Sequence, residues 1–277
     1  MIKIAVIGIA GESVFLSVDK FAKIGETAVA TDYHAELGGK GFNQAVAAAR
    51  CGARVSFLCA AHKEDVDKFK KIALSVGVKP FFVGKEECSP YAVIITDKSG
   101  DNSVTVYHGA ELSAADVECF YDEIKSADIL LINNEVPHAV NERAVEIAKK
   151  FGVKIILNPA PYRETKKDFL NKIDLFTPNE HETKGLEEYD NVIITQGKDG
   201  AFIKSLGELV PAVKIKKAID TTGAGDTFSG VLAFYIASGK DLKEACEKAS
   251  VAAAIKVGKR YILDAIPTIE QIENYNV

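Results

Sequence analysis

The chain has 277 residues, of which 47% are hydrophobic and 26% charged, so it is long enough for one large α/β domain with a sizeable core. Its 34 Lys and Arg residues and 39 Asp and Glu residues give a net charge of −5 without a basic block, which argues against a nucleic-acid partner. No apolar run approaches the roughly 18 residues of a membrane span, so no membrane partner is expected. Five scattered cysteines without a Cys-x-x-Cys pair fit reduced thiols in a cytoplasmic protein.

Short apolar runs alternate with segments of helical spacing along most of the chain. Continuous apolar runs of this length are typical of parallel strands that are covered on both faces. The expected strands span residues 2–9, 53–60, 127–133, 153–159, 173–178 and 191–197. The expected helices between them span residues 43–52, 65–77, 113–126 and 140–152. This alternation predicts an α/β fold, a three-layer α/β/α domain with a mainly parallel sheet.

Two segments break the alternation. Residues from about 12–37 and 80–110 show period-two patterning around turn signals, which predicts a small antiparallel β-sheet. We expect this sheet to form a lid over one edge of the main sheet, within a single domain that spans residues 1–277. In the last third, residues 225–239 and 241–258 are predicted as two helices, and the first is expected to be buried because it is apolar on nearly all sides.

A Gly-rich turn, "GGKGFNQA" at residues 38–45, leads into the first expected helix. Its glycines would let a ligand approach the backbone closely, and Lys40 and Asn43 supply donors for a phosphate or a hydroxylated ligand. A plain turn between a strand and a helix explains the same residues equally well.

Two polar turns follow later strands. In "TPNEHE" at residues 177–182, Asn179 and Glu182 share a helix face, and their oxygens suit magnesium that carries a nucleotide, often through water. Spacing alone favours a capping box, in which Asn179 caps the helix and Glu182 reaches back. The turn "ITQGKDG" at residues 194–200 can bind a nucleotide or simply join a hairpin.

The stretch "TTGAGDTFSG" at residues 221–230 is the most informative motif. Backbone N–H groups at a Gly-rich helix start can surround a phosphoryl group. Asp226 would repel a phosphate there, so it either only caps the helix or accepts a proton from an attacking hydroxyl. The second role resolves the conflict and makes Asp226 the candidate general base. The five dispersed histidines lack metal-ligand spacing and are interpreted as structural or exposed.

Four motifs in this order, "GGKGFNQA", "NPAP" at residues 158–161, "TPNEHE" and "DTTGAGDTFSG", resemble the ribokinase-like sugar kinases, the PfkB family. The chain is closest in these motifs to the ribokinases among them, and the likeness extends from Ile4 to about Pro267. The resemblance implies ATP-dependent, Mg²⁺-assisted phosphorylation of a hydroxymethyl group on a sugar or nucleoside. It also implies a β-sheet lid that often mediates homodimers.

The resemblance assigns roles residue by residue. It implies that Asp226 is the catalytic base and that Gly223, Ala224 and Gly225 form its anion hole. The substrate-binding positions that it implies are Gly11, Ser13, Gly39, Lys40, Gly41, Asn43, Glu135 and Asp226. The nucleotide-binding positions that it implies are Asn179, Thr195, Gln196, Gly197, Gly200, Gly225 and Ser250. Glu182 would hold Mg²⁺ through water, and Asp220 and Thr222 are candidate ligands of a monovalent cation such as K⁺.

The chain departs from the family pattern at three places. Residues 11–13 stand where ribokinases carry Asn-x-Asp, and in an extended segment Glu12 points away from Ser13 and cannot replace the lost aspartate. Residues 261–263, Tyr-Ile-Leu, stand where ribokinases have a Gly-Ala-rich loop that helps to coordinate the monovalent cation. The short stretch between Glu182 and Val192 predicts that a helix beside the nucleotide half is missing.

The sequence therefore predicts an ATP-dependent sugar kinase with ribose or a related pentose as acceptor. Another sugar, a nucleoside, or a non-catalytic sugar-binding regulator on the same fold remain alternatives. A dinucleotide-dependent oxidoreductase is not expected, because "GIAGES" after the first strand lacks the G-x-G-x-x-G spacing.

Overall fold

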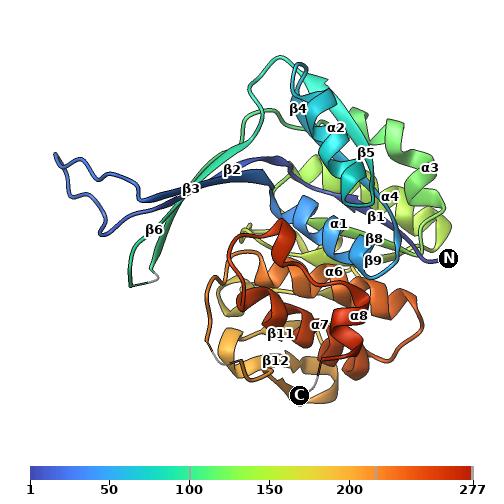
Figure 1. Ribbon diagram of the computed structural model, residues 1–277. Coiled ribbons are helices and arrows are strands. Elements are labelled where there is room, and N and C mark those ends of the chain that lie inside the picture. Colours follow the sequence, from blue (N-terminus) through green and yellow to red (C-terminus); the bar gives the residue numbers. More distant parts are fainter. Residues whose placement is uncertain (100, 216, 276–277) are drawn as a thin grey trace.

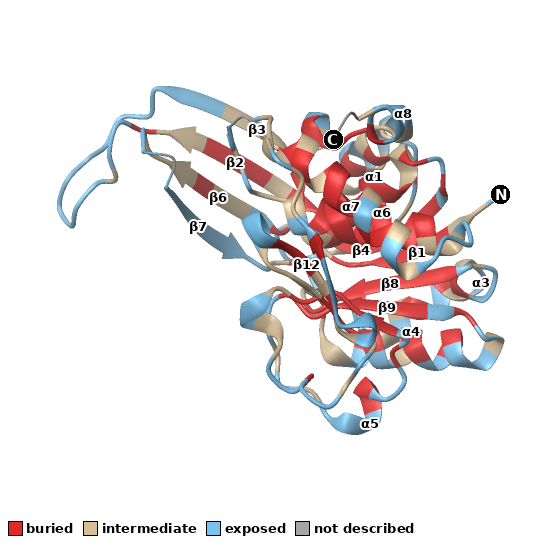
Figure 2. Cartoon of the chain, turned by 90° about the horizontal axis from the view of Figure 1, so that it is seen from below, coloured by how far each residue is buried: buried red, intermediate tan, exposed pale blue. Residues whose placement is uncertain are grey.

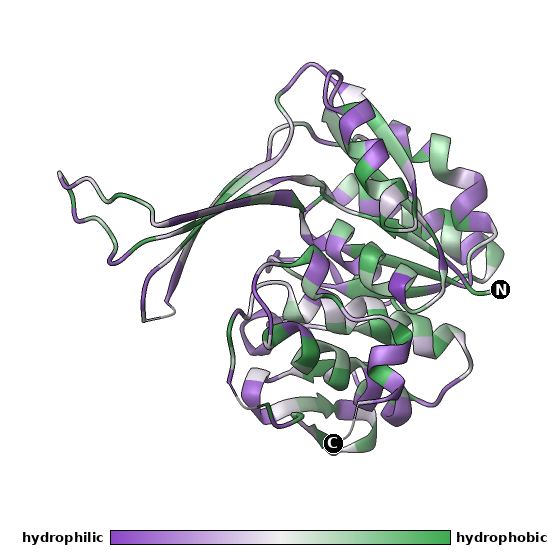
Figure 3. Ribbon diagram, viewed as in Figure 1, coloured by the Kyte–Doolittle hydropathy of each residue, from purple (hydrophilic) through white to green (hydrophobic). Residues whose placement is uncertain are grey.

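A computed structural model describes residues 1–99, 101–215 and 217–275. Its body is a six-stranded sheet in the order β10-β9-β8-β1-β4-β5, and every neighbouring pair is parallel. The six strands are β1 (Lys3–Ile7), β4 (Arg54–His62), β5 (Val78–Lys85), β8 (Ile129–Asn133), β9 (Lys154–Asn158) and β10 (Leu175–Phe176). The strands at the centre of the sheet are hydrophobic, and the flanking helices mix both kinds of residue (Figure 3).

Helices cover both faces of this sheet (Figure 1). Successive residues of a strand point to opposite faces, so Ile4 and Val6 of β1 join one hydrophobic cluster and Ala5 and Ile7 join the other. The first face is covered by α1 (Lys40–Arg50), α2 (Val66–Ser75), α6 (Ala224–Ala237), α7 (Leu242–Val257) and α8 (Ile269–Glu273). The second face is covered by η1 (Ala114–Phe120), α3 (Tyr121–Lys125), α4 (His138–Phe151) and α5 (Lys167–Leu170). The predicted three-layer architecture is confirmed.

A four-stranded sheet, called the lid from here on after the prediction, projects from the body (Figure 1). Its strands β2 (Gly11–Ser17), β3 (Asp32–Gly38), β6 (Tyr91–Thr96) and β7 (Asn102–Tyr107) lie in the order β3-β2-β6-β7. The β2–β3 and β6–β7 pairs are antiparallel, as predicted, and the two hairpins meet through a parallel pairing of β2 with β6. The outer strand β7 is exposed along its whole length (Figure 2).

The predicted lid boundary at residue 80 is wrong. Residues 78–85 form β5, which pairs with β4 at the edge of the main sheet. An edge strand of a parallel sheet is partly solvated, so β5 mixes buried, half-buried and exposed residues in place of a continuous buried run, and Pro80 is tolerated there. The pattern therefore mimicked a lid strand.

Residues 191–197 are also placed differently from the prediction. Here β11 (Ile193–Thr195) forms a small antiparallel sheet with β12 (Gly200–Ile203) and β13 (Glu208–Pro211). Isolated parallel bridges, Phe176 with Val192 and Asn179 with Thr195, tie this sheet to the body. A short apolar run does not specify the direction of its partner strand, which explains the error.

The remaining elements are short. The segment predicted as a helix at residues 113–126 is divided between the 3-10 helix η1, which begins at a capping box of Ser113 and Asp116, and the short α-helix α3. The other 3-10 helices are η2 (Glu180–Glu182), η3 (Gly197–Asp199), η4 (Lys204–Leu206) and η5 (Leu263–Ala265). Residues 183–191 contain turns and no helix, in agreement with the expected loss of a helix there. Among the described residues, no helix is long and apolar enough to cross a membrane.

Candidate active site

Asp226 lies in the first turn of α6, and Gly223 is the residue directly before this helix. Gly223 has a φ of 73°, a left-handed conformation that glycine adopts at little cost. The Asp226 side chain is almost fully buried, and its Oδ2 accepts a hydrogen bond of 2.9 Å from Asn43 Nδ2 of α1. No side chain caps α6 at Gly223, so the geometry speaks against helix capping as the task of Asp226.

A cavity of about 200 Å³ opens beside Asp226 at the carboxyl end of the sheet, where open α/β sheets place ligands. It brings together Lys40, Asn179, Glu182, Thr195, Gly223, Gly225 and Asp226, all of which the sequence singled out. The four motifs that contribute them are far apart along the chain. Their convergence on one cavity is the main geometric support for the predicted site.

Lys40 is the cation of this cavity. The charge of Asp226 raises the pKa of Lys40, and Glu135 and Glu182 add to this effect, while burial opposes it. The carboxylate of Glu135 accepts a hydrogen bond of 2.9 Å from the Lys40 backbone N–H, and burial raises the pKa of Glu135 to about 7. Glu135 therefore lies behind the Gly-rich turn and fixes its backbone, and it does not line the cavity itself.

The turn at residues 38–41 is a tight connection between a strand and a helix, which is one of the two interpretations of "GGKGFNQA" given above. Gly39 has a φ of 115°, and a side chain there would collide with the carbonyl oxygen of Ile9. A side chain on Gly41 would come within 2.6 Å of the Gly8 backbone. The glycines thus bring the start of α1, with Lys40 and Asn43, against the end of β1. The same turn also contributes Lys40 to the cavity, so the ligand-binding interpretation stays open.

Gly11 and Ser13 lie at the base of the lid, in β2, and do not line the cavity. Ser13 is buried and pairs with Glu36 of β3. The Glu12 side chain forms an ion pair of 3.3 Å with Lys68 on α2. The expectation that Glu12 faces away from Ser13 is therefore confirmed.

The capping box in "TPNEHE" is confirmed. Glu182 Oε2 accepts a hydrogen bond of 3.0 Å from the Asn179 N–H, and Asn179 Oδ1 accepts one of 2.9 Å from the His181 N–H. Both side chains also line the cavity. A carboxylate has about four lone-pair sites, so one capping hydrogen bond leaves Glu182 able to hold a hydrated Mg²⁺. The two interpretations therefore coexist, and these residues fit the metal that the family implies.

The turn "ITQGKDG" joins β11 to β12, so the hairpin interpretation is confirmed. Gln196 N donates a hydrogen bond of 2.7 Å to Gly200 O across the turn. Thr195 lines the cavity, whereas Gln196, Gly197 and Gly200 lie outside its lining. Ser250 is buried in α7 and also lies outside it, as does Ala224. Their predicted roles toward the nucleotide and the phosphoryl group therefore stay predictions.

Asp220 and Thr222, the candidate ligands of a monovalent cation, contact the chain itself. Thr222 N donates to Asp220 Oδ1 at 2.9 Å, and Tyr261 N donates to Asp220 Oδ2 at 3.0 Å. The fully buried ammonium of Lys256 donates to Asp220 O at 2.8 Å and lies 3.8 Å from Asp220 Oδ1. A lysine ammonium thus lies where the family resemblance implied a monovalent ion, and these residues do not fit that ion.

Four residues of the cavity lining lie within the quoted motifs but were given no role by the sequence analysis: Asn158, Ala160, Thr177 and Thr221. The Asn158 side chain accepts a hydrogen bond from Gln44 at 3.2 Å and donates one to Thr177 O at 2.7 Å. Asn158 is the last residue of β9, and Thr177 comes directly after β10. Polar residues at the carboxyl ends of parallel strands are the signal that would have assigned them a role.

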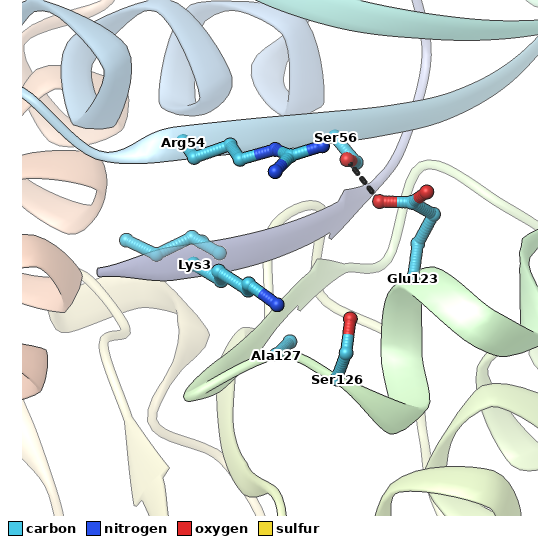
Figure 4. Close-up of a pocket in the computed structure, with 7 residues that line it drawn as sticks. Lys3, Arg54, Ser56, Glu123, Ser126 and Ala127 are labelled. Carbon is cyan, nitrogen blue, oxygen red and sulfur yellow. Dashed lines mark hydrogen bonds between the residues drawn. The ribbon is translucent and has the colours of Figure 1, made fainter. Parts of the chain in front are cut away.

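A second pocket, of about 80 Å³, lies at the amino ends of the central strands β1 and β4 (Figure 4). Lys3 and Arg54 at the beginning of β1 and β4 face Glu123 there, and Ser56 Oγ donates a hydrogen bond of 2.5 Å to Glu123. This pocket is smaller than the cavity at Asp226, and the sequence analysis assigned no role to its residues. Among the described residues, no group of three or more His, Cys, Asp and Glu side chains could hold a metal ion.

A family model described as pfkB family carbohydrate kinase matches residues 1–269 of this chain. The chain belongs to the pfkB family of carbohydrate kinases. Its curated relatives in this family include a ribokinase of Haemophilus influenzae, 36% identical over 92% of each chain. They also include a deoxyribokinase of Salmonella typhi, 32% identical over 98% of each chain. The predicted family and enzyme class, a sugar kinase, are confirmed.

Solved structures of the pfkB family share the fold. A ribokinase of Thermotoga maritima superposes with a TM-score of 0.83 at 29% identity, covering 99% of this chain and 98% of the other. A ribokinase of Arabidopsis thaliana complexed with ribose and ATP superposes with a TM-score of 0.85 over the whole of both chains. Its identity of 24% makes this second likeness an argument for the fold alone.

Proposed function

We propose that this kinase transfers the γ-phosphoryl group of ATP, with Mg²⁺, to a primary hydroxyl of ribose or a related pentose. The observation that carries the proposal is the convergence of Lys40, Asn179, Glu182 and Asp226 on one cavity. A buried carboxylate, a cation and a helix start are the parts that phosphoryl transfer to an alcohol requires.

Asp226 acts in this proposal as the general base. Its carboxylate reaches the cavity from the first turn of α6, and the Asn43 amide holds one of its oxygens in place. The acceptor hydroxyl gives its proton to this carboxylate as its oxygen attacks the γ-phosphorus, and the bond from that phosphorus to the leaving oxygen of ADP breaks. The N–H groups at the α6 start, from Gly223 onward, stabilise the negative charge on the transferring group.

We assign the two substrates to different residues near Asp226: the sugar to Asn43, which hydrogen-bonds to Asp226, and the nucleotide to residues of the cavity lining. Asn43 Oδ1 is buried and, among the described residues, has no hydrogen-bond partner, so a sugar hydroxyl that donates to it would satisfy a costly orphan acceptor. Asn179, Glu182 and Thr195 line the same cavity as Asp226, and we assign the nucleotide phosphates to them. Glu182 would hold the hydrated Mg²⁺, which neutralises phosphate charge when bound.

Ribose is the proposed acceptor because ribokinases recur among the relatives at 30–36% identity. A deoxyribokinase at 32% identity makes 2-deoxyribose the first competitor. The missing Asn-x-Asp at residues 11–13 leaves the sugar hydroxyls with fewer partners, and such partners discriminate strongly between sugars.

The decisive experiment is a panel of pentoses, 2-deoxyribose, hexoses and nucleosides with ATP and Mg²⁺, with ADP release as the readout. We expect release with ribose or another pentose. Asp226→Asn should lower kcat by roughly 10²-fold or more while sugar binding, measured by calorimetry, stays nearly intact. If no acceptor leads to ADP release, a sugar-binding regulator is favoured. If Asp226→Asn keeps the full wild-type turnover, Asp226 is not the general base.

We also propose a homodimer that forms through the lid. All six residues of β7 are exposed, and Val104, Val106 and Tyr107 among them are more than half exposed. An uncovered edge strand with apolar side chains is a surface on which a second lid can pair. Light scattering behind a sizing column would measure the mass, and Val106→Lys should shift it toward the monomer.

We also propose a cytoplasmic location, which is supported by five free thiols, three of them buried.

A further inference from the structure

Lys256 is the most unusual charged residue outside the cavity. It lies at the end of α7 with its side chain fully buried, which is rare for a lysine and costly unless the ammonium is paired. Burial lowers the pKa of Lys256, and the charge of Asp220 opposes this shift. The proposed chemistry at Asp226 does not use this ammonium directly, so its position calls for another explanation.

The ammonium of Lys256 binds the segment that leads into the anion hole. Its hydrogen bond to Asp220 O and its contact with Asp220 Oδ1 hold the residue three positions before Gly223. Ile219 N and Asp220 N both donate to Val257 O, so the end of α7 and this segment are joined twice. A change in the position of Asp220 would therefore be passed on to the start of α6.

Asp220 also connects two loops. Its Oδ1 accepts from Thr222 N, and its Oδ2 accepts from Tyr261 N in the loop that follows α7. The three oxygens of Asp220 thus each have a donor, and the buried ammonium of Lys256 has this partly buried carboxylate as its counter-charge. A metal cation placed on the same oxygens would meet two N–H groups and a like charge.

The loop after α7 is held from its other side by the lid. Glu36 of β3 accepts hydrogen bonds from Ile262 N at 2.7 Å and from Leu263 N at 3.1 Å, and Tyr261 stacks on His34 at 3.8 Å. Tyr261 has a φ of 63°, which a non-glycine residue adopts only when its surroundings determine it. The Tyr-Ile-Leu sequence of residues 261–263 is thus built into this arrangement with Lys256 and Asp220.

We propose that the ammonium of Lys256 is a built-in cation, which positions the loop at residues 220–226 and makes the enzyme independent of a monovalent metal ion. Lys256 is a positioning residue in this proposal, because it acts on the anion hole through Asp220. The part that concerns turnover rests on the proposed function, whereas the part that concerns ion binding does not.

The first test uses the wild-type protein and two readouts. Steady-state kinetics with the sugar found in the acceptor panel are compared in KCl and in tetramethylammonium chloride of equal ionic strength, together with the Kd of Mg·ADP from calorimetry. We expect kcat, KM and Kd to agree within about twofold. Activation of about fivefold or more by K⁺, or clearly tighter Mg·ADP binding in KCl alone, would overturn the proposal. The calorimetric arm needs no acceptor, so it decides the question of the ion even if no sugar is phosphorylated.

The second test removes the charge. Lys256→Met keeps the length of the side chain, and we expect kcat to fall by about tenfold or more while KM for the sugar changes by less than about threefold. Lys243→Met, on an exposed turn of the same helix, is the matched control and should change neither value. A Lys256→Met enzyme that folds and keeps the wild-type kcat would overturn the positioning role. If that variant does not fold, the comparison of the two salts with the wild-type protein still decides whether the enzyme is independent of a monovalent metal ion.

Discussion

The contact between α1 and α6 provides the sharpest test of how packing positions the base. Gly230 of α6 lies directly against α1, and a Cβ added there would come within 2.8 Å of the Ala47 Cβ and closer still to the carbonyl oxygen of Gln44. Carbon atoms in contact are separated by about 3.5–4.0 Å, so Gly230→Ala requires the helices to move apart by roughly 1 Å. The clash is with backbone, and no side-chain rotation relieves it.

Two effects of Gly230→Ala follow from this displacement. Overpacking of a core costs about 1–3 kcal/mol, which for a chain of this size lowers Tm by roughly 2–10 °C. Asn43 on α1 and Asp226 on α6 are joined by a hydrogen bond of 2.9 Å, which the same movement would break. A misplacement of about 1 Å at a catalytic group can cost on the order of 10²-fold in rate, so kcat should fall by about 10- to 100-fold.

Calorimetry for Tm and coupled detection of ADP for kcat measure the two effects of Gly230→Ala. Gly225→Ala is the control for stability, because a Cβ at this position of the same helix meets nothing within 4 Å and alanine favours helices. We expect Gly225→Ala to keep or raise Tm. A Gly230→Ala variant as stable as wild type, or a Gly225→Ala variant that loses as much stability, would refute the reasoning.

Three further substitutions test the roles of Glu135, Glu182 and Glu12. Because burial raises the pKa of Glu135 to about 7, the unfolded state ionises first as pH rises above the usual value of 4.5, and the folded state loses stability until about pH 7. Urea denaturation should therefore show that the free energy of unfolding of Glu135→Gln rises relative to that of the wild type between about pH 5 and pH 8. A difference that stays constant over this range would contradict the burial argument. Glu182→Gln keeps an acceptor for the capping box, so Tm should stay unchanged. The Mg²⁺ concentration for half-maximal velocity should rise by about tenfold, and an unchanged Mg²⁺ requirement would show that Glu182 does not hold the metal. Glu12→Gln loses only an exposed ion pair and should change Tm by less than about 2 °C and kcat/KM hardly at all, whereas a large loss of activity would place Glu12 at the sugar.

The fold was predictable from the sequence wherever a pattern has one structural meaning. The apolar runs of β1, β8 and β9 are buried on both faces, and α6 is apolar on nearly all sides, so their placement in the core follows directly from composition. Prediction failed where the pattern has two meanings. An edge strand such as β5 is as partly solvated as a hairpin strand, and the three-residue β11 is too short to specify its partners.

The site was predictable where its residues stand in turns that can be recognised from the sequence, namely Gly-rich turns and helix caps. Lys40, Asn179, Glu182 and Asp226 stand in Gly-rich or capping turns, and they meet in the cavity. Asn158 and Thr177 open the motifs "NPAP" and "TPNEHE", but their contribution to the cavity depends on which strands are neighbours in the sheet. The contact of Lys256 with Asp220 joins residues 36 positions apart, and local sequence carries no trace of it.

The hydrogen bond between Asn43 and Asp226 spans 183 residues of chain, and this separation has a consequence for folding. During synthesis β1, β4 and α1 leave the ribosome long before α6 and α7, which cover the same face of the sheet. Loop closure over such a distance carries an entropy cost that only the docking of the last helices repays. The catalytic carboxylate proposed here is therefore delivered by the element that completes the core. A chain cut before α6 would expose an apolar sheet face and would be inactive, with aggregation as its expected fate.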